Sequence, residues 1–174
     1  MGVAHFALVA VSSFLTANSS LLAVSPPNAN NDKVFIESVL FQTPIREFDR
    51  SRFMLRRQNQ WLDWTTDGCS IPVIGGEGRS FNFSAACRRH DFGYRNFKLL
   101  DQRYNCPEYT VGSICGTNSW SYGRYWNSLQ RQKIDDQFKL DMLENCASRS
   151  RTMRARCEAW ALTYFQSVRL VGGL

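Results

Sequence analysis

Six cysteines, all of them after residue 68, are the feature that most constrains the fold of this 174-residue chain. An even cysteine count in a small chain is typical of a disulfide framework formed in an oxidising compartment. Six cysteines can pair in many ways, but local spacing favours bridges between neighbours in the chain: Cys69–Cys87, Cys106–Cys115 and Cys146–Cys157. The rival interpretation is a zinc site that includes Cys87 and His90, although the paired Cys-x-x-Cys spacings typical of such sites are missing.

The N-terminal segment carries no charged side chain. Residues 1–31 contain no Lys, Arg, Asp or Glu, so the whole formal charge of +6 belongs to the rest of the chain. The run 3–11 is apolar apart from His5, which is too short to span a bilayer and fits the core of a secretory signal. We expect a signal peptide over 1–24, a linker or short propeptide over 25–33, one domain over 34–174, and secretion to the extracellular space. The alternative is a buried N-terminal helix.

Apolar residues follow a helical spacing over most of the remaining chain. They recur three and four residues apart from Val34 to about Asn59, with a break at Pro44. Further helices are predicted over 84–97, 128–146 and 160–170, and a long loop over 101–128. No strand-like alternation and no internal repeat occurs. The predicted fold class is all-α, a small disulfide-stapled domain with two long helices that carry the candidate catalytic residues.

His90 is the best candidate for acid–base chemistry, because the other histidine, His5, lies in the segment expected to be removed. No other side chain has an unperturbed pKa near neutral pH. The predicted 128–146 helix offers Asp135 as its partner. We expect this carboxylate to accept a hydrogen bond from Nδ1–H and to stabilise the imidazolium that forms when Nε2 takes a proton. The alternative is that both are ordinary surface or core residues of their helices.

Asp91 follows His90 but points in another direction, because consecutive helical residues are about 100° apart. A Cys69–Cys87 bridge would bring it to the turn that holds Asp67 and Gly68. Two carboxylates and a backbone carbonyl make the oxygen-rich surroundings that calcium prefers. A cation there would stabilise the oxyanion of an ester while His90 activates water. The residues therefore indicate metal-assisted hydrolysis, although Asp67 also fits an ordinary turn.

Two strings of this sequence carry a family resemblance. The string CRRHDFGYRN contains His90 and Asp91, and LDWTTDGC contains Asp67. Together they resemble the secreted phospholipases A2 of bacteria and filamentous fungi, and the resemblance extends to Asp135, Phe138 and the last cysteine pair. The stretch 99–130 is longer than in compact family members, and the loop after Cys69 departs from the usual family pattern. These departures bear on substrate access rather than on the chemistry.

The resemblance implies a mostly helical domain that hydrolyses the sn-2 ester of glycerophospholipids to a fatty acid and a lysophospholipid, with Ca2+ as cofactor. Carried over by position, it makes His90 the base and Asp135 its orienting carboxylate. It makes Asp67 and Asp91 side-chain ligands of calcium, and Gly68 a backbone-carbonyl ligand.

The basic balance of the chain, with a sequence pI of about 9.2, favours anionic lipid surfaces as partners. Two groups of arginines contribute to it: Arg46, Arg50, Arg52, Arg56 and Arg57, and then Arg149, Arg151, Arg154 and Arg156. They fit ordinary solvated faces equally well. No motif supports nucleic-acid binding, and we expect a monomer that acts on phospholipid membranes or micelles. The second hypothesis is a catalytically silent secreted lipid-binding or effector protein on the same scaffold.

Overall fold

The part of the chain that the structure describes, residues 28–69, 81–104 and 123–171, is helical and contains no strand. The computed structural model has these elements: α1 (Ala29–Glu37), the π-helical turn η1 (Ser38–Gln42), α2 (Ile45–Gln58), α3 (Ser84–Tyr104), α4 (Ser128–Ala147) and α5 (Arg151–Val171). The predicted all-α class is confirmed, and so is the break at Pro44, which separates η1 from α2.

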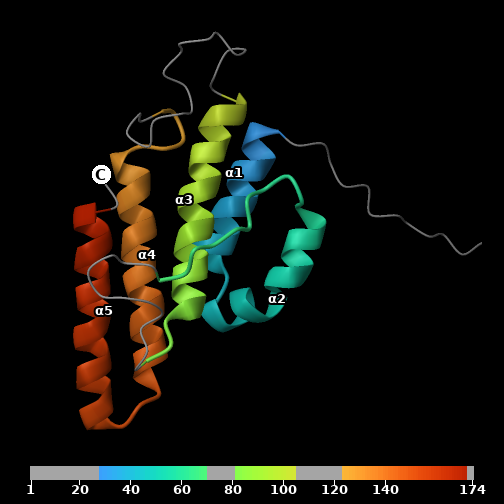
Figure 1. The fold of residues 1–174 in the computed structure, drawn as a ribbon. Helices are drawn as coiled ribbons and strands as arrows, with labels where there is room; N and C mark the ends of the chain where they lie inside the picture. The colour runs from blue at the N-terminus through green and yellow to red at the C-terminus, as the bar shows by residue number, and fades with distance from the viewer. Residues whose placement is uncertain (1–27, 70–80, 105–122, 172–174) are drawn as a thin grey trace, which may run out of the picture.

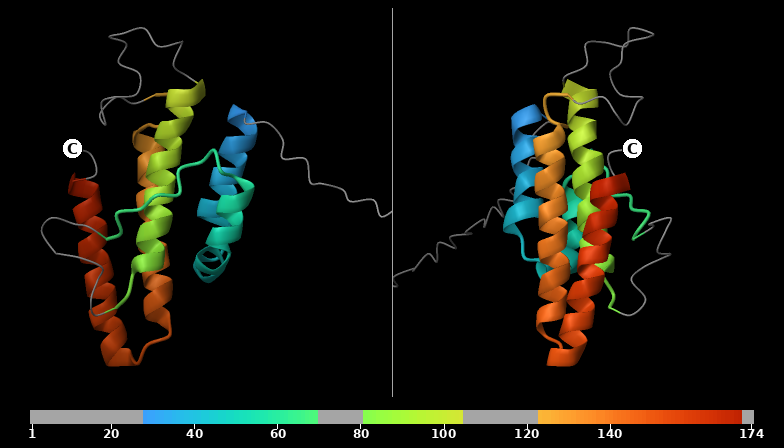
Figure 2. Two further views of the ribbon diagram at one scale, coloured as in Figure 1. Left: turned by 45° about the vertical axis from the view of Figure 1, so that its right-hand side comes forward. Right: turned by 90° about the vertical axis from the view of Figure 1, so that its left-hand side faces the viewer.

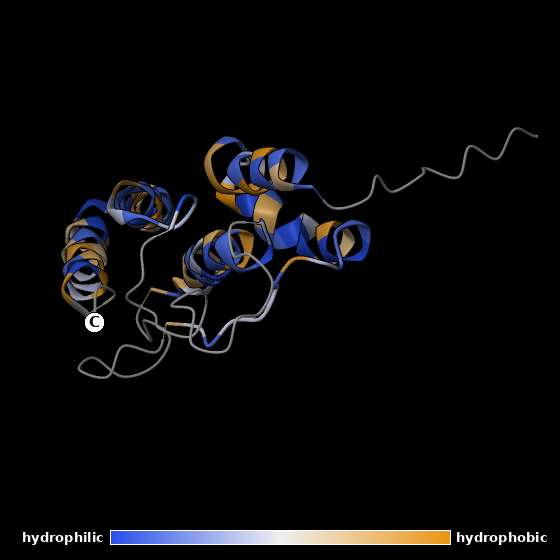
Figure 3. Cartoon of the chain, turned by 90° about the horizontal axis from the view of Figure 1, so that it is seen from above, coloured by the Kyte–Doolittle hydropathy of each residue, from blue (hydrophilic) through white to orange (hydrophobic). Residues whose placement is uncertain are grey.

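The three long helices α3, α4 and α5 run side by side, with α4 in contact with both of the others (Figures 1 and 2). The short helices α1 and α2 pack against α3 on the side away from α5 (Figure 2). Each helix carries hydrophobic residues on part of its surface and hydrophilic residues on the rest (Figure 3). None of the helices in the described ranges is long and apolar enough to cross a membrane.

The buried apolar residues form two clusters that share α3 and α4. The first joins α1, η1 and α2 to α3 and includes Ile36, Leu40, Phe48 and Phe92. The second joins the start of α3 to α4 and α5 and includes Phe83, Cys87, Phe138, Met142, Ala161 and Tyr164. Because α3 lies between the two clusters, its orientation is fixed from both sides.

Gly93 allows α3 to approach its neighbours closely. A Cβ added there would lie 3.0 Å from Ile134 Cγ2 of α4 and 3.0 Å from Leu40 Cδ2 of η1. A glycine inside a helix costs about 1 kcal/mol relative to alanine. Here that cost is offset by the close contact between α3 and α4, the two helices that carry His90 and Asp135.

A buried ion pair also joins these two helices. Arg89 of α3 and Asp141 of α4 are each only 2% exposed and bind each other through two hydrogen bonds. Arg89 also donates to the backbone carbonyl of Thr43. Burial raises the pKa of Asp141, and the hydrogen bonds and charge of Arg89 act against that shift.

Two of the expected disulfides are present. Cys69–Cys87 ties the segment before α3 to the first turns of α3, with a Cα–Cα distance of 5.3 Å. Cys146–Cys157 joins α4 to α5, with a Cα–Cα distance of 5.6 Å. The expected Cys106–Cys115 bridge and the signal peptide over 1–24 lie outside the described residues.

The first helix begins earlier than the sequence predicted. The side chain of Asn28 caps α1 by accepting a hydrogen bond from a backbone N–H of the first turn. Asp32 is only 3% exposed, and it accepts hydrogen bonds from Trp61 Nε1 and from the Tyr104 hydroxyl, both at 2.7 Å. Helix α1 therefore begins inside the 25–33 stretch that was expected to be a linker or short propeptide, because its polar composition hid a cap and a buried carboxylate.

Helix α3 also runs further than predicted, to Tyr104, so residues 101–104 of the expected 101–128 loop are helical. Asp101 lies inside α3 and accepts hydrogen bonds from the backbone N–H groups of Tyr125 and Trp126. These bonds satisfy backbone donors just before α4 begins. The end of α3 therefore positions the start of α4.

Candidate active site

His90 and Asp135 meet between α3 and α4. Nε2 of His90 lies 2.9 Å from Oδ1 of Asp135. The imidazole packs against the rings of Tyr94 and Phe138, with centroid distances of 4.3 and 4.8 Å. These contacts hold the ring in one orientation, with 11% of the His90 side chain exposed.

The ring nitrogens have the opposite roles to those the sequence analysis expected. Asp135 contacts Nε2 rather than Nδ1. Nε2 is the nitrogen farther from the helix backbone, so it reaches a carboxylate on the neighbouring helix. Because an ionised carboxylate only accepts hydrogen bonds, Nε2 carries the proton and Nδ1 keeps its lone pair. Nδ1 has no hydrogen-bond partner in the described part of the chain, which leaves it available to a water molecule.

Asp135 is fully buried, and three further polar side chains surround it. The Tyr94 hydroxyl donates to Oδ1 at 2.7 Å, while Arg131 Nε and Arg169 Nη1 lie 3.8 and 3.4 Å from Oδ2. Burial, followed by the charge of Asp135, raises the pKa of Tyr94, so its hydroxyl stays protonated as a donor. No role for Tyr94 was predicted from the sequence.

Asp67 and Asp91 form a second acidic pair beside His90. The two carboxyl groups interact as hydrogen-bond partners and as like charges, and the Thr66 hydroxyl donates to Asp91 Oδ2 at 2.5 Å. Burial raises the pKa of Asp91 to about 6, and the negative charge of Asp67 contributes to this rise. The structure therefore brings together the carboxylates that the sequence analysis expected to meet.

Asn96 holds the segment that leads to Asp67. Its fully buried amide accepts a hydrogen bond from the backbone N–H of Asp63 at 2.8 Å and donates to the Asp63 carbonyl at 2.7 Å. Gly68 has a φ of 73°, in the left-handed region that favours glycine. The Cys69–Cys87 bridge fixes the end of the segment. Asn96 was not predicted as a site residue, although it stands in the same string as His90 and Asp91.

The Asp67–Asp91 pair would supply two of the six to eight oxygen ligands that a calcium ion takes. In residues 28–69, 81–104 and 123–171, no three His, Cys, Asp or Glu side chains are close enough together to hold a metal ion. Calcium readily takes backbone carbonyls and waters alongside carboxylates. Burial and the neighbouring charge of Asp67 raise the pKa of Asp91, and a divalent cation beside the pair would favour its ionised form. The zinc alternative is wrong for Cys87, because that residue is in a disulfide.

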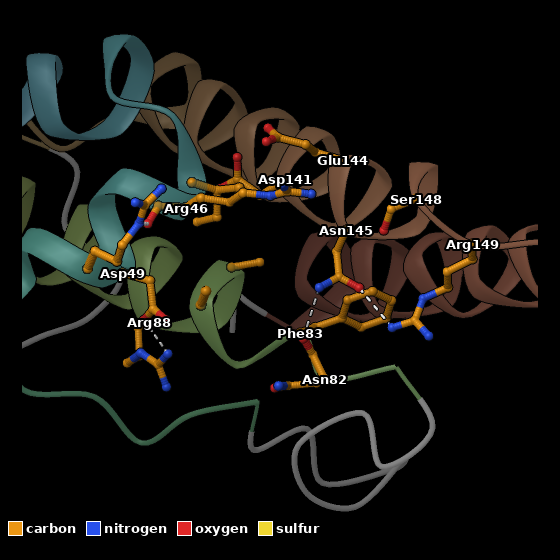
Figure 4. A pocket seen from close by; sticks show the side chains of 14 residues that line it. Arg46, Asp49, Asn82, Phe83, Arg88, Asp141, Glu144, Asn145, Ser148 and Arg149 are labelled. Atoms are coloured by element: carbon orange, nitrogen blue, oxygen red, sulfur yellow. Dashed lines mark hydrogen bonds and ion pairs between the residues drawn. The ribbon is translucent and has the colours of Figure 1, made fainter.

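A cavity of about 420 Å³ opens elsewhere, between α2, the start of α3 and the end of α4 (Figure 4). Neither the His90–Asp135 pair nor the Asp67–Asp91 pair lines it. Two of its charged residues, Arg88 and Asp49, form an ion pair. The cavity is therefore separate from the candidate active site.

Comparison with known proteins decides the family. The model of the prokaryotic phospholipase A2 family matches residues 36–108 and 105–172 of this chain. The chain belongs to this family. Two fungal phospholipase A2 relatives are similar along most of it. One, named secretory phospholipase A2, from Beauveria bassiana, is 31% identical over 134 residues. The other, with the same name, from Arthroderma benhamiae, is 28% identical over 159 residues.

The two alignments cover these relatives differently. The match to the Beauveria protein includes 77% of this chain but only 55% of that protein, so the chain spans about half the length of that relative. The match to the Arthroderma protein includes 88% of this chain and 89% of that protein. The phospholipase A2 family match extends from the end of α1 to the end of α5, so it includes the His90–Asp135 pair and the Asp67–Asp91 pair.

Proposed function

We propose that this chain is a secreted, calcium-dependent phospholipase A2 that hydrolyses the sn-2 ester of glycerophospholipids. The observation that carries the proposal is the hydrogen bond between His90 and buried Asp135, next to the Asp67–Asp91 pair. Family membership and the printed names of both relatives support phospholipase A2 activity and secretion.

In the proposed mechanism, the Nδ1 atom of His90 takes a proton from a water molecule, whose oxygen attacks the ester carbonyl carbon. Asp135 stabilises the resulting imidazolium through Nε2–H. The imidazolium then returns the proton to the departing glycerol oxygen, which gives a fatty acid and a lysophospholipid. Tyr94 and Phe138 keep the ring edge-on to the water throughout.

The proposed calcium ligands are the carboxylates of Asp67 and Asp91 and the carbonyl of Gly68. When bound, the ion would supply a Lewis acid for the substrate phosphate and for the negative charge that develops on the ester oxygen. The guanidinium of Arg95 lies 3.3 Å from Asp67. The proposed substrate is presented by a membrane or micelle surface, and the protein acts as a monomer.

The test is fatty-acid release from phospholipid vesicles. We expect His90→Ala to abolish release while the helical circular dichroism spectrum stays unchanged. EDTA should abolish release by the unmodified protein, and calcium should restore it. Full activity of His90→Ala, or of the EDTA-treated protein, would contradict the proposal. The alternative of a silent lipid-binding protein predicts vesicle binding with no release under any condition.

A further inference from the structure

We propose that Arg169, at the end of α5, is a positioning residue that holds Asp135 in the orientation His90 requires. This inference rests on the proposed function, because it concerns the same His90–Asp135 pair. It adds α5, which carries neither the candidate base nor a candidate calcium ligand, to the helices that form the candidate active site.

The two oxygens of Asp135 have separate tasks. Oδ1 accepts hydrogen bonds from His90 and Tyr94. Oδ2 faces Arg169 Nη1 at 3.4 Å and Arg131 Nε at 3.8 Å, one guanidinium from α5 and one from α4. A carboxylate with no exposed surface requires such charge partners, because burying an unpaired ion is costly. With Oδ2 held, the carboxylate cannot rotate Oδ1 away from Nε2.

Arg131 fixes the end of α5 in the place where Arg169 can act. Its Nη2 donates to the backbone carbonyls of Val168 at 3.3 Å and Arg169 at 2.7 Å. The last carbonyls of a helix have no partner within the helix, and a cation there is favoured by the helix dipole. Arg131 Nε also lies 3.2 Å from the Tyr94 hydroxyl. One arginine thus links α3, α4 and the last turn of α5 around Asp135.

Arg169 can be replaced without emptying the core. Its side chain is 39% exposed, whereas that of Arg131 is 13% exposed. The buried residues of α5, such as Cys157, Ala161 and Tyr164, lie further back along the helix. Loss of the Arg169 guanidinium should therefore change the orientation of Asp135 more than the stability of the fold.

The experiment compares Arg169→Met with Arg169→Lys and with Arg156→Met, a control on an exposed position of the same helix. We expect Arg169→Met to lower kcat about tenfold to hundredfold, because misplacing an orienting group by a fraction of an ångström is costly. KM and the calcium concentration for half-maximal activity should stay unchanged. Arg169→Lys should restore part of kcat, and Arg156→Met should match the unmodified protein. An unchanged kcat in Arg169→Met would overturn the inference.

A double-mutant cycle separates positioning from a general structural effect. If Arg169 acts through Asp135, Arg169→Met should cost nothing further in an Asp135→Asn background. An equal loss in both backgrounds would overturn the inference. The His90 Nε2–H proton resonance provides a readout without turnover: it should shift in Arg169→Met and stay in place in Arg156→Met. An unshifted resonance contradicts the positioning role, whereas an inactive unmodified protein with the expected shift contradicts only the proposed function.

Discussion

The two acidic sites beside His90 are built in opposite ways. Asp135 has no exposed surface, and the protein surrounds it with an imidazole, a phenol and two guanidinium groups. Asp67 and Asp91 face each other as like charges, and the side chain of Asp67 is 66% exposed. The protein thus surrounds Asp135 with counter-charges, whereas at the second site Arg95 lies 3.3 Å from Asp67 and the two carboxyl groups still act on each other as like charges. The turnover rate should depend on Asp135 at every calcium concentration. It should depend on Asp67 and Asp91 only because they bind calcium.

The largest expected effect is at Asp135. Asp135→Asn should lower kcat about a thousandfold or more, because the amide cannot stabilise the imidazolium and favours the wrong tautomer. The measurement is fatty-acid release at saturating calcium, with Asp136→Asn on the exposed side of α4 as the matched control. If higher calcium restored fatty-acid release by Asp135→Asn, the proposed difference between Asp135 and the Asp67–Asp91 pair would be wrong.

At the Asp67–Asp91 pair, a substitution should weaken calcium binding. Calcium at about one hundred times its dissociation constant should stabilise the unmodified protein by about 2.7 kcal/mol, which a thermal melt detects. Asp91→Asn should remove most of this increase in Tm, and Asp49→Asn, at an exposed position on α2, should not. A full calcium-dependent shift in Asp91→Asn would place the ion elsewhere.

A smaller effect should be the pH dependence of calcium binding. The pKa of Asp91 is raised to about 6 by burial, so the stability that this carboxyl contributes to the calcium-free protein is lost as pH rises through about 6. Below that pH a proton competes with calcium for Asp91. The calcium concentration for half-maximal stabilisation should rise up to about tenfold per pH unit below 6, measured by melts at several pH values. Asp67 and His90 are charged neighbours, so Asp91→Asn is the control that isolates this carboxyl.

The smallest effect should come from a substitution of Gly93, which lies where α3 and α4 approach each other. Gly93→Ala adds a methyl group 3.0 Å from Ile134 and Leu40, which should cost about 1–3 kcal/mol in packing, partly offset by about 1 kcal/mol of helix propensity. Urea denaturation should show a modest loss of stability. The calcium-dependent rise in Tm should persist, because Asp67 and Asp91 lie outside this contact.

Site residues that are neighbours in the chain could be predicted from the sequence. Site residues that reach the site only through the packing of distant helices could not. His90 and Asp91 are neighbours on one helix, so helical geometry alone sends them to different sites. Arg169 could not be predicted, because its place depends on how α5 docks against α4, which no local pattern records. The ring nitrogen that meets Asp135 was also assigned wrongly, since it depends on how close two helices lie. The separation of α3 and α4 in turn depends on Gly93.

The same reasoning applies to the expected domain boundary. The starts of α2, α3 and α4 were predicted close to their observed positions, because apolar spacing reports helices well. The start of α1 was missed, since Asn28 and Asp32 look like linker residues until their partners are known. Polar residues that act inside a fold are therefore the hardest to place from composition.

The buried carboxylate of Asp32 sets a limit on trimming by a maturation protease. Trp61 and Tyr104 both donate to it from distant parts of the chain. A cut after Asp32 would leave an indole N–H and a phenol without their acceptor and would detach the first helix from the end of α3. We therefore expect a protein cut before Asn28, whose side chain caps that helix, to keep its full stability, and a protein cut after Asp32 to lose part of it.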